Sequence, residues 1–288
     1  MRVEFAPSPQ DPPYLRLLGY DVVDDPLWQQ TTLRLYWQAL AALPENTRVW
    51  PFFFDDAGFL IEDTSQRPMV APIWYPPAHW QPGETVITET LPWQMGARFN
   101  IGVAILDGEA SARRWAVITA DAGARPHQGR SWIQLGTFSR VGRYLTPAPD
   151  APALLRADVT FAEGIRLVGY RVEAAAGSLS VVLAWQTQAA VARDYTAFVH
   201  LIAPDGTMLA QSDAQPHWGA EWPTSRWAPG ETALDGHRLV LPAGAPPGPY
   251  KVRVGLYDWQ TLQRLPVLDA GGQPVADYAA LETSPPTR

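Results

Sequence analysis

Residues 15–22 read Leu-Arg-Leu-Leu-Gly-Tyr-Asp-Val, and residues 165–172, 150 positions later (165 minus 15), read Ile-Arg-Leu-Val-Gly-Tyr-Arg-Val. Further pairs follow in the same order: residues 35–38 with 183–186, residues 80–84 with 227–231, and Leu91-Pro92 with Leu241-Pro242. A long segment that recurs in order points to a copied domain. We therefore predict a duplication, with residues 1–146 as the first repeat, 147–158 as a proline-rich linker and 159–288 as the second repeat.

Both repeats alternate apolar and other residues with a period of two, which is typical of half-buried strands. The alternating apolar positions are Leu33, Leu35 and Trp37 in the first repeat and Leu179, Val181, Leu183 and Trp185 in the second. Pro204-Asp205-Gly206 predicts a hairpin turn, and only residues 37–43 favour a short helical turn. Many short strands without intervening helices predict two tandem antiparallel β-sandwiches, immunoglobulin-like or jelly-roll-like.

The composition of the 288 residues excludes several classes of protein. Pro 29 and Gly 22 together give 51 residues, which disfavours long helices, and 47% hydrophobic residues provide enough apolar side chains for packed cores. There is no Cys for a disulfide or a thiol nucleophile. The net charge is −7 and Lys251 is the only lysine, so we expect no nucleic-acid partner.

Catalytic motifs are missing from the sequence. It contains no G-x-S-x-G, H-E-x-x-H, G-x-G-x-x-G or P-loop pattern. His200 on a predicted strand could be read as a metal ligand, but no closed ligand set surrounds it in the sequence. We expect a non-catalytic protein without a metal or another cofactor. A glycosidase, which would need two acidic residues facing each other in a cleft, is a weaker alternative.

The second repeat resembles a known family through motifs spread along most of its length. They include residues 195–201 (Tyr-Thr-Ala-Phe-Val-His-Leu), Asp205-Gly206, residues 227–231 (Trp-Ala-Pro-Gly-Glu), residues 247–250 (Pro-Gly-Pro-Tyr) and residues 255–258 (Gly-Leu-Tyr-Asp). This pattern resembles the β-sandwich repeat at the C-terminal, extracytoplasmic end of bacterial membrane glycosyltransferases that are similar to dolichyl-phosphate-mannose mannosyltransferases. The resemblance implies an extracytoplasmic accessory domain with a membrane-embedded parent or partner.

The first repeat departs from this pattern. Residues 50–54 (Trp-Pro-Phe-Phe-Phe) replace the strand of His200, and residues 75–77 (Tyr-Pro-Pro) replace Pro223-Thr224-Ser225. Because the first repeat starts almost at Met1, we expect the sequence to be a piece of a longer protein.

The sequence holds 13 tryptophans, and indole faces can stack on the apolar faces of sugars. Trp37 and Trp185 occupy equivalent strand positions, which predicts core packing. Trp80 and Trp227 both precede a Pro-Gly-Glu motif by one residue, and we expect them to anchor a loop.

Residues 214–230 form the longest predicted loop, and loops of that length are usually functional or disordered. In one reading, Trp218 and Trp222 present their rings to a ligand while His217, Glu221, Asp213 and His200 supply hydrogen bonds. In the other, the loop folds back and buries its own indoles.

The expected function is therefore an accessory ectodomain associated with glycosyl transfer in the cell envelope, whose candidate ligand is a glycan or a lipid-linked sugar. The alternative is a purely structural spacer or protein-interaction ectodomain.

Overall fold

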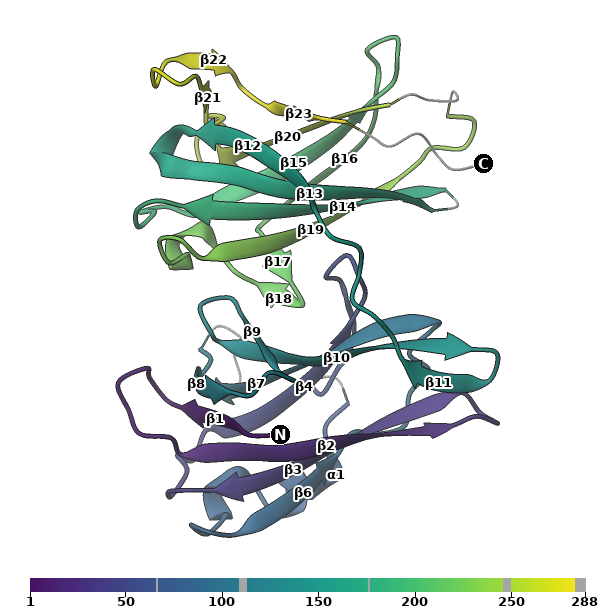
Figure 1. The fold of residues 1–288 in the computed structure, drawn as a ribbon, viewed down its shortest axis with the longest axis vertical. Helices are drawn as coiled ribbons and strands as arrows, with labels where there is room; N and C mark the ends of the chain where they lie inside the picture. Colours follow the sequence, from purple (N-terminus) through teal and green to yellow (C-terminus); the bar gives the residue numbers. More distant parts are fainter. Residues whose placement is uncertain (66, 109–112, 176, 246–249, 283–288) are drawn as a thin grey trace. The chain divides into compact units, whose positions relative to one another are not determined.

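The computed structural model describes all residues except 66, 109–112, 176, 246–249 and 283–288. The predicted motif at residues 247–250 thus lies mostly outside the described residues. The chain divides into two compact units, one of Met1–Asp56 with Leu60–Ala151 and one of Ala57–Phe59 with Pro152–Arg288. The regular elements of each unit are almost all antiparallel strands, so the all-β fold predicted from the sequence is confirmed (Figure 1).

The first unit contains two layered sheets. One has the order β6 (Thr85–Glu89), β3 (Gln30–Ala39), β2 (Leu15–Asp25), β1 (Val3–Ala6) and β8 (Ala116–Ala120). The other has the order β11 (Tyr144–Pro147), β10 (Trp132–Val141), β7 (Arg98–Asp107), β4 (Thr47–Phe54) and β5 (Leu60–Asp63), and β9 (Arg125–His127) also pairs with β10. Between β5 and β6 lie a short helix α1 (Val70–Trp74) and a 3-10 turn η1 (Pro77–His79).

The second unit also has two main sheets. The first contains, in order, β19 (Thr232–Val240), β14 (Ser178–Thr187), β13 (Ile165–Ala175), β12 (Leu155–Phe161), β21 (Val267–Leu268) and β22 (Pro274–Ala276). The second contains β16 (Met208–Ala214), β15 (Tyr195–Ile202), β20 (Lys251–Asp258) and β23 (Ala279–Leu281). A two-stranded hairpin of β17 (His217–Trp218) and β18 (Ala220–Glu221), with 3-10 turns η2 (Ala162–Gly164) and η3 (Thr224–Arg226), completes the unit.

The strand orders of the two units correspond. The order β6-β3-β2-β1-β8 of the first unit matches β19-β14-β13-β12-β21 of the second, and β5-β4-β7-β10 matches β16-β15-β20-β23. The repeated stretch found in the sequence also carries the same irregularity, because the register shifts between Leu17 and Gly19 in β2 and between Leu167 and Gly169 in β13. Each shift is a β-bulge, which bends the strand at that point. A duplication of one sandwich would produce this correspondence, and the duplication itself stays a prediction.

The core of each unit lies between its two sheets. In the first unit Leu35 and Trp37 of β3 pack in one cluster with Phe53 of β4 and Ile101 of β7. The second unit has the equivalent cluster around Trp185. Trp37 and Trp185 are both fully buried, which confirms the core role that their strand phase predicts.

The structure differs from two local expectations. The helical turn predicted at residues 37–43 is wrong: residues 37–39 belong to β3, and α1 forms instead at Val70–Trp74. Strand pairing overrides local propensity at residues 37–39, because β2 and β6 pair with β3 on either side. The predicted linker overlaps strands at both ends, since β11 extends to Pro147 and β12 begins at Leu155. The described residues contain no helix with the length and apolar character of a membrane span.

Candidate functional site

The loop singled out in the sequence is folded and anchored to the second unit. The hydroxyl of Thr224 donates to the carbonyl of Arg193 (2.6 Å) and accepts from the N–H of Tyr195 (2.9 Å). The indole N–H of Trp227 donates to the carbonyl of Trp222 (2.9 Å). Trp80 of the first unit makes the equivalent bond, 3.0 Å long, to the carbonyl five residues before it. Both indoles are buried, as expected for residues that anchor a loop.

The loop's own indoles are buried as well. Trp218 is 7% exposed and Trp222 is 9% exposed, and Trp222 packs in the core cluster of the second unit. A sugar ring could stack on either indole only if the loop moved. Their burial agrees with the alternative in which the loop folds back over its own indoles. A ligand role for Trp218 and Trp222 stays a prediction.

Beneath the loop lies a buried polar network centred on Asp235, which is fully buried on β19. Its carboxylate accepts from the indole N–H of Trp185 (3.1 Å), the ring Nε2 of His237 (3.0 Å) and the backbone N–H of His217 (3.2 Å). The other ring nitrogen of His237, Nδ1, lies 3.1 Å from the hydroxyl oxygen of Ser212. The network therefore ties the loop, through His217, to the interior of the sandwich.

This network keeps the buried carboxyl group charged. Burial by itself raises the pKa of Asp235, but the interactions with His237, His217 and the indole N–H of Trp185 together outweigh burial, so the net pKa lies below the usual range. A buried charge is tolerated when its lone pairs are satisfied by donors. In the first unit Thr88 occupies the equivalent position and accepts only the indole N–H of Trp37, at 3.0 Å, among the contacts described.

The remaining predicted residues lie elsewhere on the second unit. His200 on β15 and Asp213 on β16 face each other, with 3.6 Å between Nε2 and Oδ1. Their neighbours in sequence, Val199 and Ser212, point to the sheet's inner side, so His200 and Asp213 lie on its outer face. Burial lowers the pKa of His200 although Asp213 acts in the opposite direction. Glu221 is exposed on β18. The structure thus brings together His200 with Asp213, and His217 with Asp235, as two separate pairs.

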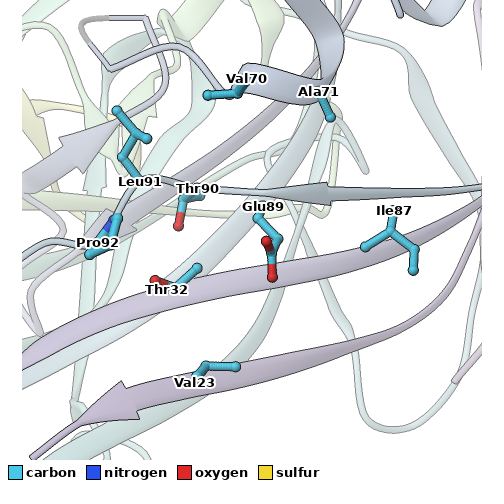
Figure 2. Close-up of a pocket in the computed structure, with 9 residues that line it drawn as sticks. All are labelled: Val23, Thr32, Val70, Ala71, Ile87, Glu89, Thr90, Leu91 and Pro92. Atoms are coloured by element: carbon cyan, nitrogen blue, oxygen red, sulfur yellow. The ribbon is translucent and has the colours of Figure 1, made fainter.

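The first unit carries a groove that the sequence did not single out. Its volume is about 630 Å³, and it is lined by Val23, Thr32, Val70, Ala71, Ile87, Glu89, Thr90, Leu91 and Pro92. Figure 2 shows Val70 and Ala71 of α1 on one side of β6, and Thr32 and Val23 on the other. Four of the apolar lining residues are unusually exposed: Val23 45%, Val70 52%, Ile87 49% and Leu91 39%.

Helix α1 extends this apolar surface. None of its five residues is buried, although its sequence Val-Ala-Pro-Ile-Trp is wholly apolar. Trp74 is 81% exposed, and it lies one helical turn after Val70 and hence on the same face. The segment after the helix is fixed, because the hydroxyl of Tyr75 donates to Glu84 (2.8 Å) and the indole of Trp80 donates to the Tyr75 carbonyl.

Large exposed apolar patches on folded domains mark interaction sites, and ligand grooves are usually apolar with a few polar groups. The polar groups here are the Glu89 carboxylate, held by Arg34 Nε at 2.6 Å, and the threonine hydroxyls. The arrangement can hold an uncharged ligand that has an apolar part and hydroxyl groups. The sequence signal that could have pointed to this surface is the apolar run between Pro68 and Pro76. Prolines keep such a run out of a sheet interior.

Within the described ranges, His, Asp and Glu side chains form no cluster of three that could hold a metal ion. No family model and no curated protein matches this chain.

Proposed function

We propose that this chain is a non-catalytic accessory module that binds carbohydrate through the groove of its first unit. The single observation that carries the proposal is Trp74, a tryptophan 81% exposed on a helix that lines a groove. Trp74 extends the exposed apolar side chains of the groove, and a contiguous exposed apolar patch marks an interaction site. Its flat apolar face suits the C–H face of a sugar ring.

The chemistry of the groove supports the same ligand class. Glu89 is held in place by its ion pair with Arg34, and its carboxylate has enough lone pairs to accept a hydrogen bond from a sugar hydroxyl as well. Extracytoplasmic location and association with a membrane-embedded glycosyltransferase belong to this proposal too. They rest on the resemblance of the second repeat.

The test is a glycan array followed by calorimetry on the glycans retained. Replacing Trp74 by Ala removes the stacking surface, and we expect the affinity to fall roughly tenfold, equivalent to about 1.4 kcal/mol. The matched control is Trp259→Ala, which removes another exposed indole (59%) from the second unit. Unchanged binding by the Trp74 variant would remove the proposed site.

A second candidate function is a structural spacer, and the burial of Trp218 and Trp222 favours it. A spacer predicts that the array retains no glycan at all. The same experiment therefore separates the two functions.

A further inference from the structure

We infer that the ligand of the groove is an amphipathic glycolipid, whose hydrocarbon chain lies in the groove while its sugar ring stacks on Trp74. This inference rests on the proposed function and narrows its ligand class. The lining and the charge of the groove favour an uncharged chain, and its size favours a small ligand over a protein.

The lining is mostly apolar, and two of its polar groups, those of Thr90 and Glu89, already have partners within the unit. The hydroxyl of Thr90 accepts the backbone N–H of Leu33 at 2.9 Å. The Glu89 carboxylate pairs with the guanidinium of Arg34, at 2.6 Å from Nε and 2.5 Å from an outer nitrogen. A charged ligand would have to compete with this pair. An uncharged chain can instead lie on the neighbouring apolar side chains and leave this pair exposed to water and to sugar hydroxyls.

The exposed apolar side chains give such a chain its affinity. Val23, Val70, Ile87 and Leu91 line the groove and are each between 39% and 52% exposed. Covering them releases about 25 cal/mol for each Å² of apolar surface removed from water. A sugar alone offers few apolar groups for this purpose, whereas a hydrocarbon chain offers them along its whole length.

The size of the groove favours a small ligand over a protein. Its volume of about 630 Å³ falls within the range of roughly 300–1,000 Å³ typical of small-molecule sites. A stable protein interface needs about 800 Å² from each partner, a much wider surface than a groove formed by one helical turn and three strands provides.

The experiment measures binding of butyl, hexyl and octyl β-glucosides and α-mannosides by calorimetry, below their micelle-forming concentrations. Each methylene that enters the groove contributes about 0.8 kcal/mol, or roughly fourfold in affinity. We expect octyl glycosides to bind on the order of 200-fold more tightly than butyl glycosides. Ile87→Ser with Leu91→Ser should flatten this dependence. Trp74→Ala should weaken all chain lengths by one factor and leave the dependence intact.

The outcomes distinguish this inference from the proposed function. Sugar binding that is independent of chain length would overturn the glycolipid and leave carbohydrate binding standing. If hexanol and octanol bind as tightly as the matching glycosides, carbohydrate binding fails while the chain assignment stands. A chain-length gain that survives in the double serine variant, or that also disappears in the control Leu262→Ser (Leu262 is 74% exposed on the second unit), would overturn the groove as its source. Concentration-dependent dimers of the wild-type chain, broken by the double serine variant, would make a second copy the occupant and overturn the inference.

Discussion

Replacing Asp235 by Ala tests whether the buried network holds the second unit together. The substitution leaves three donors without their acceptor: the indole of Trp185, the ring of His237 and the backbone N–H of His217. Each hydrogen bond to a charged group contributes about 1.5–3 kcal/mol, and a buried donor left without an acceptor costs about 1–3 kcal/mol. Because these contributions overlap, we expect a loss of roughly 4 kcal/mol in the unfolding free energy of the second unit.

The matched control is Thr88→Ala, since Thr88 occupies the equivalent position in the first unit. It accepts the indole N–H of Trp37 (3.0 Å), a single neutral hydrogen bond. Its loss should cost only about 1–2 kcal/mol. Urea unfolding followed by hydrogen exchange in β14 and β19 measures the second unit, and exchange in β3 and β6 measures the first.

The pH dependence gives a second measurement on the same residue. The pKa of Asp235 is lowered in the folded state because His237, His217 and Trp185 together outweigh the opposing effect of burial. The resulting stabilisation is complete above the unfolded pKa of about 4. It is lost as the pH falls below that value toward the folded pKa. If Asp235→Ala costs no more than Thr88→Ala, or leaves the acid sensitivity of β14 and β19 unchanged, the network is not what stabilises this unit.

Three further predictions concern a glycine, a histidine and a tryptophan. Gly102→Ala would place a Cβ 2.2 Å from the ring of Phe52, so it should destabilise the first unit by roughly 1–3 kcal/mol in urea unfolding. The control is Gly19→Ala, where the new Cβ meets nothing within 4 Å and the unfolding free energy should change by no more than about 0.5 kcal/mol. Burial, with Arg125, lowers the pKa of His127 from 6.5 to about 4. The unfolding free energy of the first unit should therefore fall by up to about 3 kcal/mol between pH 6.5 and pH 4. Urea midpoints measured across this pH range should show that His127→Phe abolishes the loss. Trp227→Phe removes one buried indole hydrogen bond of 2.9 Å, and faster hydrogen exchange confined to residues 214–230, with about 1–2 kcal/mol of destabilisation, is the expected result.

The regular part of the fold could be predicted because it follows from alternation. Leu33, Leu35 and Trp37 point inward from β3 in the phase that the sequence gives them, and all three are fully buried. The hairpin at Pro204-Asp205-Gly206 also forms between β15 and β16, closed by the N–H of Gly206 donating to the carbonyl of Ala203 at 2.9 Å. The buried face of β3 and the hairpin turn can both be predicted from a few neighbouring residues, because strand phase and turn type are determined locally.

The polar network and the groove could not be predicted in the same way. Asp235 and His237 are two ordinary polar residues two positions apart, and only the pairing of β19 with β14 shows that both face Trp185 and the core. The exposure of Trp74 likewise depends on what surrounds α1. An apolar run predicts burial by default, so sequence reasoning passes over an apolar helix that no other element covers.

The contrast between the two units connects these features. The same connection, from β5 to β6 in the first unit and from β16 to β19 in the second, ends in each case with a 3-10 turn and an indole bonded to the carbonyl five residues earlier. In the second unit a carboxylate oxygen of Asp235 accepts the backbone N–H of His217 and ties the connection to the interior. The indoles of this connection, Trp218, Trp222 and Trp227, are buried.

In the first unit the hydroxyl of Thr88 is occupied by Trp37. One hydroxyl cannot replace a carboxylate that accepts three donors. In this unit the connection carries its apolar residues on α1 at the surface, and Trp74 is exposed on the helix that lines the groove. The ligand surface that we propose for the first unit is thus the counterpart of the internal anchor in the second. Exchanging Thr88 for Asp would add a buried charge without the histidines that stabilise it, so this single substitution should destabilise the first unit and leave α1 exposed.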